Sequence, residues 1–419
     1  MPFYELFSIL ILLSAIFSYV NFKVLKLPQT IGVMVLALLT SILIDLAGPF
    51  IPSLGSVGHM VTGLDFNTLV MKVMLGFLLF AGGFHIDADC LRQQGLPVIT
   101  LAIFGTILSA FFVGGLSWYV FQLFGVSMPF IHCLLFGAII SPTDPIAALG
   151  ILRTAKIPYS LELKIAGESL FNDGVAIVIF ISVSELEASG GQAFSFGRIV
   201  ELFAREAGGG ILYGLLLGYS GYLILKTIDN YKVEILITLA IVMAGYALAD
   251  ILHVSGPLAM VIAGIITGNK GRKDAMSNQT KDYLSKFWEM VDEILNAVLF
   301  LLIGLEMLAV RIDPAIFLIG SILILVVLFS RWFSVMLPIR LLGRWIKFEK
   351  NAIAILSWGG LRGGISVALA LSLPLAFHRD QFVTITYMIV IFSILVQGLT
   401  IGKFARKLSG GNAELAPNE

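Results

Sequence analysis

Charged side chains are scarce in this sequence. Aspartate, glutamate, lysine and arginine make up 13% of the 419 residues, whereas soluble domains carry about 25%. Lysine plus arginine and aspartate plus glutamate each number 27, so no excess of basic charge points to a nucleic-acid partner. Hydrophobic residues make up 58% of the chain. This composition excludes a soluble globular protein and predicts an integral protein of the lipid bilayer.

Cysteine is nearly absent as well. The two cysteines, Cys90 and Cys133, lie at opposite membrane faces in the topology predicted below, so we expect neither a disulfide between them nor a thiolate metal site. The first apolar segment is too long for a cleaved signal peptide. The sequence also lacks His-Glu-x-x-His and Gly-x-Ser-x-Gly motifs, which argues against an intramembrane enzyme. The tail at 405–419 is expected to be cytoplasmic and too short for a regulatory domain.

Long apolar segments are what the sequence does contain. A helix that crosses a bilayer needs about 20 apolar residues, and thirteen segments of suitable composition are present. We therefore predict an all-α membrane protein with a single transmembrane domain over 1–404. The predicted spans are 2–22, 27–46, 66–84, 96–122, 130–151, 162–183, 207–226, 233–250, 254–268, 285–310, 314–341, 350–373 and 380–404.

Lysine and arginine set the expected orientation, because they gather in cytoplasmic loops. With the N-terminus outside, 20 of the 27 would lie in cytoplasmic segments and four in outer segments. This bias predicts a cytoplasmic C-terminus and an odd number of spans. Thirteen spans also allow two inverted six-helix repeats, spans 1–6 and 8–13. In transporters built from such repeats, corresponding helices are often interrupted near the bilayer midplane.

Helix breakers occur in the fifth span of each predicted repeat. The first contains Ser141-Pro142-Thr143-Asp144-Pro145, in which the prolines remove backbone donors and obstruct a helix. The second contains Trp358-Gly359-Gly360-Leu361-Arg362-Gly363-Gly364. Irregular backbone is tolerated at this depth only where it faces protein or a wet cavity. We therefore predict two broken helices that cross at the midplane.

Buried carboxylates accompany the first break. The sixth span contains Glu168-Ser169-Leu170-Phe171-Asn172-Asp173, with Asp173 near its middle. Carboxylates at this depth are costly and indicate an ion pathway by default. Ser169 and Asp173 are four residues apart and share a helix face. Together with Asp144 and the Thr143 carbonyl, they form an all-oxygen ligand set that suits a hard monovalent cation and not a soft transition metal.

One carboxylate is sufficient for antiport. Asp173 carries a proton when neutral and can bind a cation when ionised, so the two compete for one site. Competition combined with alternating exposure gives exchange of cation for proton. Asn172 cannot titrate, which favours a one-for-one, electroneutral exchange. Asn172 can also serve as an amide that bridges the fifth and sixth spans without contacting the ion, and this interpretation is compatible with transport.

Arg362 lies near the middle of the twelfth span and cannot lose its proton, so it needs a partner. Glu168 is the predicted partner. The pair would tie the sixth span to the second broken helix without contacting the ion. Arg331, in the eleventh span, is expected to be paired elsewhere or to extend toward the cytoplasmic surface.

These motifs resemble those of the electroneutral cation/proton antiporters, the NhaP-like sodium/proton exchangers. The resemblance rests on 141–145, 168–173 and 358–363, and their order covers essentially the whole chain. It implies a homodimer of 13-helix subunits in a cell membrane. A core bundle, about 96–183 and 314–404, would move like an elevator against a dimerisation bundle, about 1–84 and 207–310.

The resemblance also assigns roles to residues. Na⁺ or Li⁺ would be held by Asp173, Asp144, Ser169 and the Thr143 main chain. Glu168 and Arg362 would stabilise the site, and Asn172 would line the access route. The long regulatory tail of eukaryotic relatives is missing, so a prokaryotic plasma membrane is expected.

Two other functions stay open at this point. The ligand types do not distinguish Na⁺ from K⁺, so a K⁺/H⁺ antiporter on the same scaffold is an alternative. A cation channel is a weaker one, because a channel needs a continuous pore and a filter ring. No cofactor is predicted, and the expected partners are monovalent cations, protons and the bilayer.

Overall fold

The computed structural model describes residues 3–48, 50, 68–154, 157–188, 196–309, 313–344, 346 and 348–408. Nearly all of them are helical, and the predicted all-α class is confirmed. Eight helices among the described residues are long and apolar enough to cross a membrane. The predicted C-terminal tail lies outside the described residues from 409 onward.

The helices of the first half of the chain are α1 (Phe3–Val20), α2 (Gln29–Ala47), α5 (Leu75–His85), α6 (Ala88–Gln93), α7 (Gly95–Thr100), α8 (Thr106–Leu123), α9 (Phe130–Ile140), α10 (Pro145–Thr154), α11 (Tyr159–Ala188) and α12 (Phe196–Phe203). Those of the second half are α13 (Gly209–Leu225), α14 (Tyr231–Leu252), α15 (Gly256–Ile266), α16 (Arg272–Asp274), α17 (Asn278–Leu305), α18 (Pro314–Leu342), α19 (Ala352–Trp358), α20 (Gly364–Ser372), α21 (Arg379–Phe392) and α22 (Leu399–Leu408). Short π-helical segments extend or join several helices, namely η1 (Asn21–Leu25), η2 (Leu69–Met74), η3 (Leu101–Gly105), η4 (Ala204–Gly208), η5 (Thr267–Gly271) and η8 (Ser393–Gly398). The 3₁₀ turns are η6 (Glu306–Ala309) and η7 (Leu375–Phe377).

Each predicted span overlaps at least one helix, although the number that cross a membrane stays a prediction. The tenth span differs at both ends from the sequence estimate of 285–310. Its helix, α17, begins earlier, at Asn278, because the Ser277 hydroxyl accepts a hydrogen bond from the backbone N–H of Thr280 and caps the helix. It ends at Leu305, where the 3₁₀ turn η6 follows.

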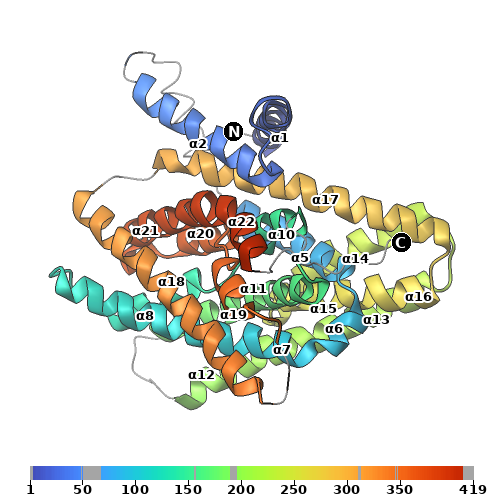
Figure 1. Cartoon of the computed structure of the whole chain (residues 1–419). Coiled ribbons are helices and arrows are strands. Elements are labelled where there is room, and N and C mark those ends of the chain that lie inside the picture. Colours follow the sequence, from blue (N-terminus) through green and yellow to red (C-terminus); the bar gives the residue numbers. More distant parts are fainter. Residues whose placement is uncertain are drawn as a thin grey trace.

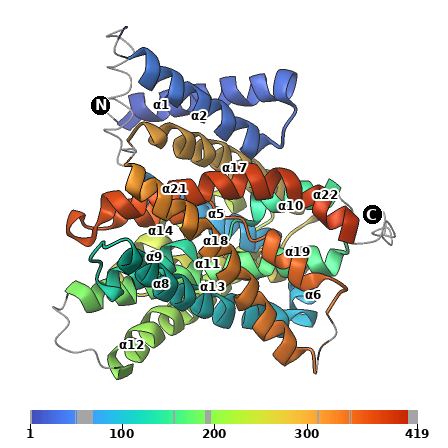
Figure 2. The ribbon, with the colours of Figure 1, turned by 60° about the vertical axis from the view of Figure 1, so that its left-hand side comes forward.

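Contacts between the helices fall into two sets. One set contains α8, α9, α11, α18, α20 and α21, and the other contains α2, α5, α13, α14, α15 and α17. The sets meet where α11 packs on α15 and α17 packs on α20. In Figure 1 the long helices α17 and α18 flank the short helices α10, α19 and α20. Figure 2 shows α1 and α2 stacked beside α17, on the edge of the second set.

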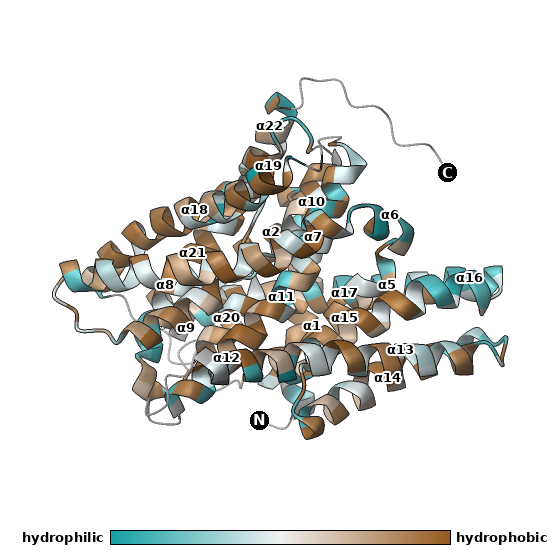
Figure 3. Ribbon diagram, turned by 90° about the horizontal axis from the view of Figure 1, so that it is seen from below, coloured by the Kyte–Doolittle hydropathy of each residue, from teal (hydrophilic) through white to brown (hydrophobic). Residues whose placement is uncertain are grey.

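The outer surface suits a hydrocarbon environment. Large apolar side chains are exposed along α13, α14 and α18, among them Leu216, Met243 and Leu325. In Figure 3, α14 and α18 are predominantly hydrophobic, whereas α6 and α16 are hydrophilic. Apolar exposure on this scale is rare in soluble monomers. The polar helices therefore mark a surface that meets water, and the long apolar helices mark the surface that meets lipid.

A glycine permits the closest helix contact in the first set. Gly137 of α9 lies so near α8 that a Cβ atom at this position would collide with the carbonyl oxygen of Ala110. Small residues at such contacts let two membrane helices approach closely and gain van der Waals contact. Gly115 of α8 differs, because no heavy atom lies within 4 Å of the position that its Cβ would take.

We expect Gly137→Ala to lower the thermal midpoint of the purified protein in detergent, because overpacking of a core costs about 1–3 kcal/mol. Gly115→Ala is the matched control and should leave the midpoint unchanged or raise it slightly. Thermal unfolding followed by intrinsic fluorescence measures both. Equal midpoints for the two variants would contradict the close contact of α8 with α9.

Candidate functional site

Both predicted helix breaks are present. The first separates α9 from α10 and the second separates α19 from α20. The N–H of Asp144 donates a hydrogen bond of 2.7 Å to the carbonyl oxygen of Leu361, and this antiparallel bridge joins the two extended segments. Unpaired backbone groups are costly away from water. The breaks therefore supply one another with partners where they cross.

Arginine side chains occupy the C-terminal ends of the two interrupted half-helices. Nη1 of Arg362 donates to the carbonyl oxygens of Ser141 (2.6 Å) and Pro142 (3.0 Å), just beyond the last residue of α9. Nη2 of Arg331 donates to the carbonyl oxygen of Leu356 (3.2 Å), near the end of α19. The C-terminus of a helix carries partial negative charge, so a cation is stabilising there.

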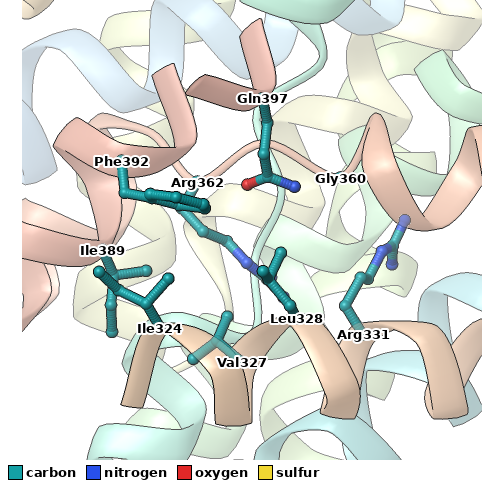
Figure 4. A pocket seen from close by; sticks show the side chains of 9 residues that line it. All are labelled: Ile324, Val327, Leu328, Arg331, Gly360, Arg362, Ile389, Phe392 and Gln397. Carbon is teal, nitrogen blue, oxygen red and sulfur yellow. The ribbon is translucent and has the colours of Figure 1, made fainter. Parts of the chain in front are cut away.

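Glu168 pairs with Arg331, so the predicted pair of Glu168 with Arg362 is wrong. The two carboxylate oxygens accept bonds of 2.5 and 3.0 Å from Nη1 and Nη2 of Arg331. Glu168 is 1% exposed and Arg331 is 6% exposed. Space for the arginine comes from Gly360, where a Cβ atom would collide with Nε of Arg331. Figure 4 shows Arg331, Gly360 and Arg362 around one small pocket beside α18.

A chain of hydrogen bonds fixes the second break from η8. The Ser393 hydroxyl accepts from the backbone N–H of Arg362 (2.9 Å) and donates to Oε1 of Gln397 (2.8 Å). Nε2 of Gln397 then donates to the carbonyl oxygen of Trp358 (3.1 Å). Neither Ser393 nor Gln397 was predicted from the sequence. The sequence feature that could have identified them is their spacing: two polar residues four apart in an apolar span lie on one helix face.

Thr143, in the first break, is held by α11 through two side chains. Nδ2 of Asn172 donates to Oγ1 of Thr143 (2.7 Å), and Oδ1 of Asn172 accepts from the backbone N–H of Thr143 (3.3 Å). The Ser169 hydroxyl donates to the Thr143 carbonyl oxygen. Asn172 therefore bridges the fifth and sixth spans, as one of the two sequence interpretations expected. Ser169, a predicted ligand, is buried and in direct contact with another predicted ligand, the Thr143 carbonyl.

A cavity of about 670 Å³ leads to the first break. Thr143, Asp144 and Asp173 line its inner end, where Asp173 is only 7% exposed. Asp87 and Glu289 line its outer end and are exposed to solvent. Three of the four predicted ion ligands thus meet at the inner end of one solvent-accessible cavity.

Asp144 also stabilises the crossing of the two broken helices. Its carboxylate lies against Gly363, where a Cβ atom would collide with Oδ2, and it directly precedes Pro145, the first residue of α10. The N-terminal ends of α10 and α20 carry partial positive charge, which a carboxylate offsets. Asp144 also repels the nearby Asp173 carboxylate electrostatically. A cation or a proton bound between the two carboxylates would relieve this repulsion.

The cavity lining is strongly acidic. No lysine or arginine occurs among the described residues that line it. A cleft with charge of one sign focuses the electric field and raises the local concentration of ions of the other sign. The cavity therefore favours cations over anions along its whole length. Its carboxylates are those of Asp87, Asp144, Glu162, Asp173, Glu289, Asp292 and Glu293.

A second buried ion pair anchors the start of α11 outside the cavity. Nζ of Lys164, a residue 1% exposed, lies 2.7 and 2.8 Å from the Glu349 carboxylate oxygens. Partial burial raises the pKa of Glu349, but hydrogen bonds from Lys164 and Ser160 outweigh it and hold the pKa below its usual value. The stabilisation is therefore present at neutral pH and is lost as pH falls through the lowered pKa. It ties α11 to the segment before α19.

Comparison with known proteins gives one consistent result. A family model described as sodium/hydrogen exchanger, transmembrane, matches residues 9–407. The chain is 44% identical over 415 residues to the Na⁺/H⁺ antiporter NhaP of Pseudomonas aeruginosa, with 97% of each chain covered. It is 33% identical over 421 residues to the Na⁺/H⁺ antiporter NhaH of Halobacillus dabanensis, with 97% of this chain and 98% of the relative covered.

The fold is also similar to a solved structure, that of the sodium proton antiporter MjNhaP1 from Methanocaldococcus jannaschii at pH 8. The TM-score is 0.72 and the sequence identity is 20%, over 96% of this chain and 97% of the other.

We expect Glu168→Ala to lower the thermal midpoint strongly, because removing one partner of a buried ion pair costs about 3–5 kcal/mol. The double variant Glu168→Leu with Arg331→Met should recover much of this loss, since no buried charge is left without its partner. Arg340→Met, on an exposed part of α18, is the control and should change the midpoint little. A double variant as unstable as Glu168→Ala would count against this pairing.

Proposed function

The chain belongs to the sodium/hydrogen exchanger family, and we propose that it exchanges one Na⁺ or Li⁺ for one proton across a membrane by alternating access. The observation that carries this proposal is the position of Asp173. Its carboxylate is buried at the inner end of an acidic, solvent-accessible cavity, next to the Asp144 carboxylate and the interrupted helix. The two relatives with sequence similarity described above are Na⁺/H⁺ antiporters, which supports the same exchange.

The proposed exchange follows from competition at this carboxylate. A cation that enters through the cavity binds to ionised Asp173 and is attracted by Asp144. Oxygens of Thr143 and Ser169, which lie in contact with one another, complete its coordination. A proton that binds to Asp173 removes the negative charge and releases the cation. Because Asp173 cannot bind a cation and a proton at the same time, the site carries either one or the other each time its exposure changes from one side of the membrane to the other.

The two sets of packed helices support alternating access. Asp173 and the first break belong to the set of α9, α11 and α18, whereas α5 and α17 belong to the other set and form part of the cavity wall. We propose that the first set moves against the second, within a homodimer in a prokaryotic plasma membrane. Because lysine and arginine gather in cytoplasmic loops, their distribution supports a cavity mouth, near Asp87 and Glu289, that opens to the cytoplasm.

Asp173→Asn should abolish Na⁺-dependent proton movement in proteoliposomes, because an amide neither titrates nor attracts a cation. A pH-sensitive dye measures proton movement under imposed Na⁺, Li⁺ and K⁺ gradients. Glu162→Gln is the matched control, since it removes one carboxylate from the same cavity and should retain exchange. Full activity of Asp173→Asn would exclude the proposed role. Exchange driven by K⁺ alone would favour the K⁺/H⁺ alternative.

One-for-one exchange should be independent of the membrane potential. Proteoliposomes clamped with K⁺ and valinomycin at different potentials should show the same initial rate of exchange under one fixed Na⁺ gradient. The physical reason is that one positive charge moves in each direction, so no net charge crosses. A rate that changes systematically with the clamped potential would contradict this stoichiometry.

A further inference from the structure

One wall of the cavity contains a buried polar group that the proposed exchange does not use. Asn296 of α17 lines the cavity and is 2% exposed. Its Nδ2 donates to the backbone carbonyl oxygen of Asp292 (2.8 Å), whereas its Oδ1 has no hydrogen-bond partner. A buried acceptor without a partner costs about 1–3 kcal/mol. An oxygen left in this condition on the wall of a cation-attracting cavity points to a ligand.

Asp292 supplies a carboxylate beside this oxygen. It is half-buried, it lines the same cavity, and it precedes Asn296 by four residues, so both lie on one face of α17. It forms no ion pair with lysine or arginine in the described part of the chain. The charged groups that act on its carboxylate, Asp144 and Glu293, are of the same sign.

A second helix brings another oxygen to the same region. Leu299, one turn after Asn296, packs on Gly364 at the start of α20. Ser366 follows on α20, lines the cavity, is 1% exposed, and its hydroxyl also has no partner. The wall where α17 meets α20 therefore holds polar oxygens that no described residue satisfies.

We propose that Asp292 and Asn296 form a second cation-binding station, separate from Asp173, at which a monovalent cation stops between solvent and the exchange site. Carboxylate and amide oxygens are hard ligands that suit such an ion. Asn296 cannot titrate, so the station binds the cation and plays no part in carrying the proton. Its helix, α17, belongs to the second set of packed helices, whereas Asp173 belongs to the first.

This station rests on the proposed function for its role, but its occupancy can be tested without transport. The transport-deficient variant Asp173→Asn keeps the station intact. We expect it to retain weak Na⁺ binding, measured with ²²Na⁺ on the purified full-length protein. Adding Asn296→Leu to this variant should abolish the remaining binding. If the double variant binds Na⁺ as well as Asp173→Asn alone, or if Asp173→Asn binds none, the station is refuted.

Transport then measures what the station contributes. Asn296→Leu and Asp292→Asn should each raise the apparent KM for Na⁺ roughly fivefold, the factor that corresponds to about 1 kcal/mol. The increase should occur only at the membrane face that contains the cavity mouth, with the maximal rate retained. Labelling of a Glu289→Cys variant with a membrane-impermeant thiol reagent identifies that face. Everted and right-side-out vesicles provide the two measurements.

Glu289→Gln is the matched control for charge. It removes one carboxylate from the same helix and the same cavity, near the mouth, and should leave KM unchanged. An equal rise in KM for Glu289→Gln and Asp292→Asn would mean that only the overall negative field acts, and would overturn the proposal. An increase in KM at both membrane faces would also overturn the proposal. Because Asn296→Leu removes an unsatisfied acceptor, its thermal midpoint should not fall. Absence of Na⁺ exchange by the wild type would refute the proposed function alone.

Discussion

The hydrogen bond between Asp144 and Leu361 joins two interrupted helices inside the membrane, and much of the structure follows from the need to make such a crossing possible. Each break frees backbone groups that lipid cannot satisfy. The bridge satisfies one N–H and one carbonyl group. Side chains from three other helical segments satisfy further groups: Asn172 and Ser169 from α11, Arg331 from α18, and Gln397 from η8.

The charges around the crossing follow the polarity of the half-helices. Arginines lie at the C-terminal ends of α9 and α19, where the helix dipoles are negative, and Asp144 lies beside the N-terminal ends of α10 and α20. Glu168 forms an ion pair with Arg331, whereas the Arg362 side chain donates to carbonyl oxygens. Neither arginine forms an ion pair with Asp173 in the described part of the chain. This separation of structural from cavity-facing charges leaves the Asp173 carboxylate available to mobile ions.

Local signals were sufficient to predict the breaks and the position of Asp173. Proline and glycine clusters act on their own backbone, and the depth of a carboxylate can be counted along an apolar segment. The partner of Glu168 could not be predicted in this way. Helical periodicity gives the direction of Glu168 relative to its own helix, but not the rotation of α18 or the space beside Gly360 that Arg331 fills. Asn296 was missed for the same reason, since only tertiary packing places it on the cavity wall.

The side of Asp173 away from the cavity bears on the proposed alternating access. The next two turns of α11 are buried, and Gly174 packs against Leu258 of α15, so a Cβ atom at this glycine would collide with the leucine. This contact joins the two sets of packed helices and is apolar. In the proposed exchange, a cation at Asp173 would therefore have a polar route on one side and an apolar contact on the other.

An apolar contact has no directional bonds to break, so the proposed motion of the first set along it would cost less than motion along an interface of ion pairs. The ion pairs of Glu168 with Arg331 and of Lys164 with Glu349 lie instead between α11 and the segment from α18 to α19. Buried ion pairs thus tie α11 to α18 and to its following segment, whereas the ion pair of Glu185 with Arg205, between α11 and η4, is exposed and the contact of Gly174 with Leu258 is apolar.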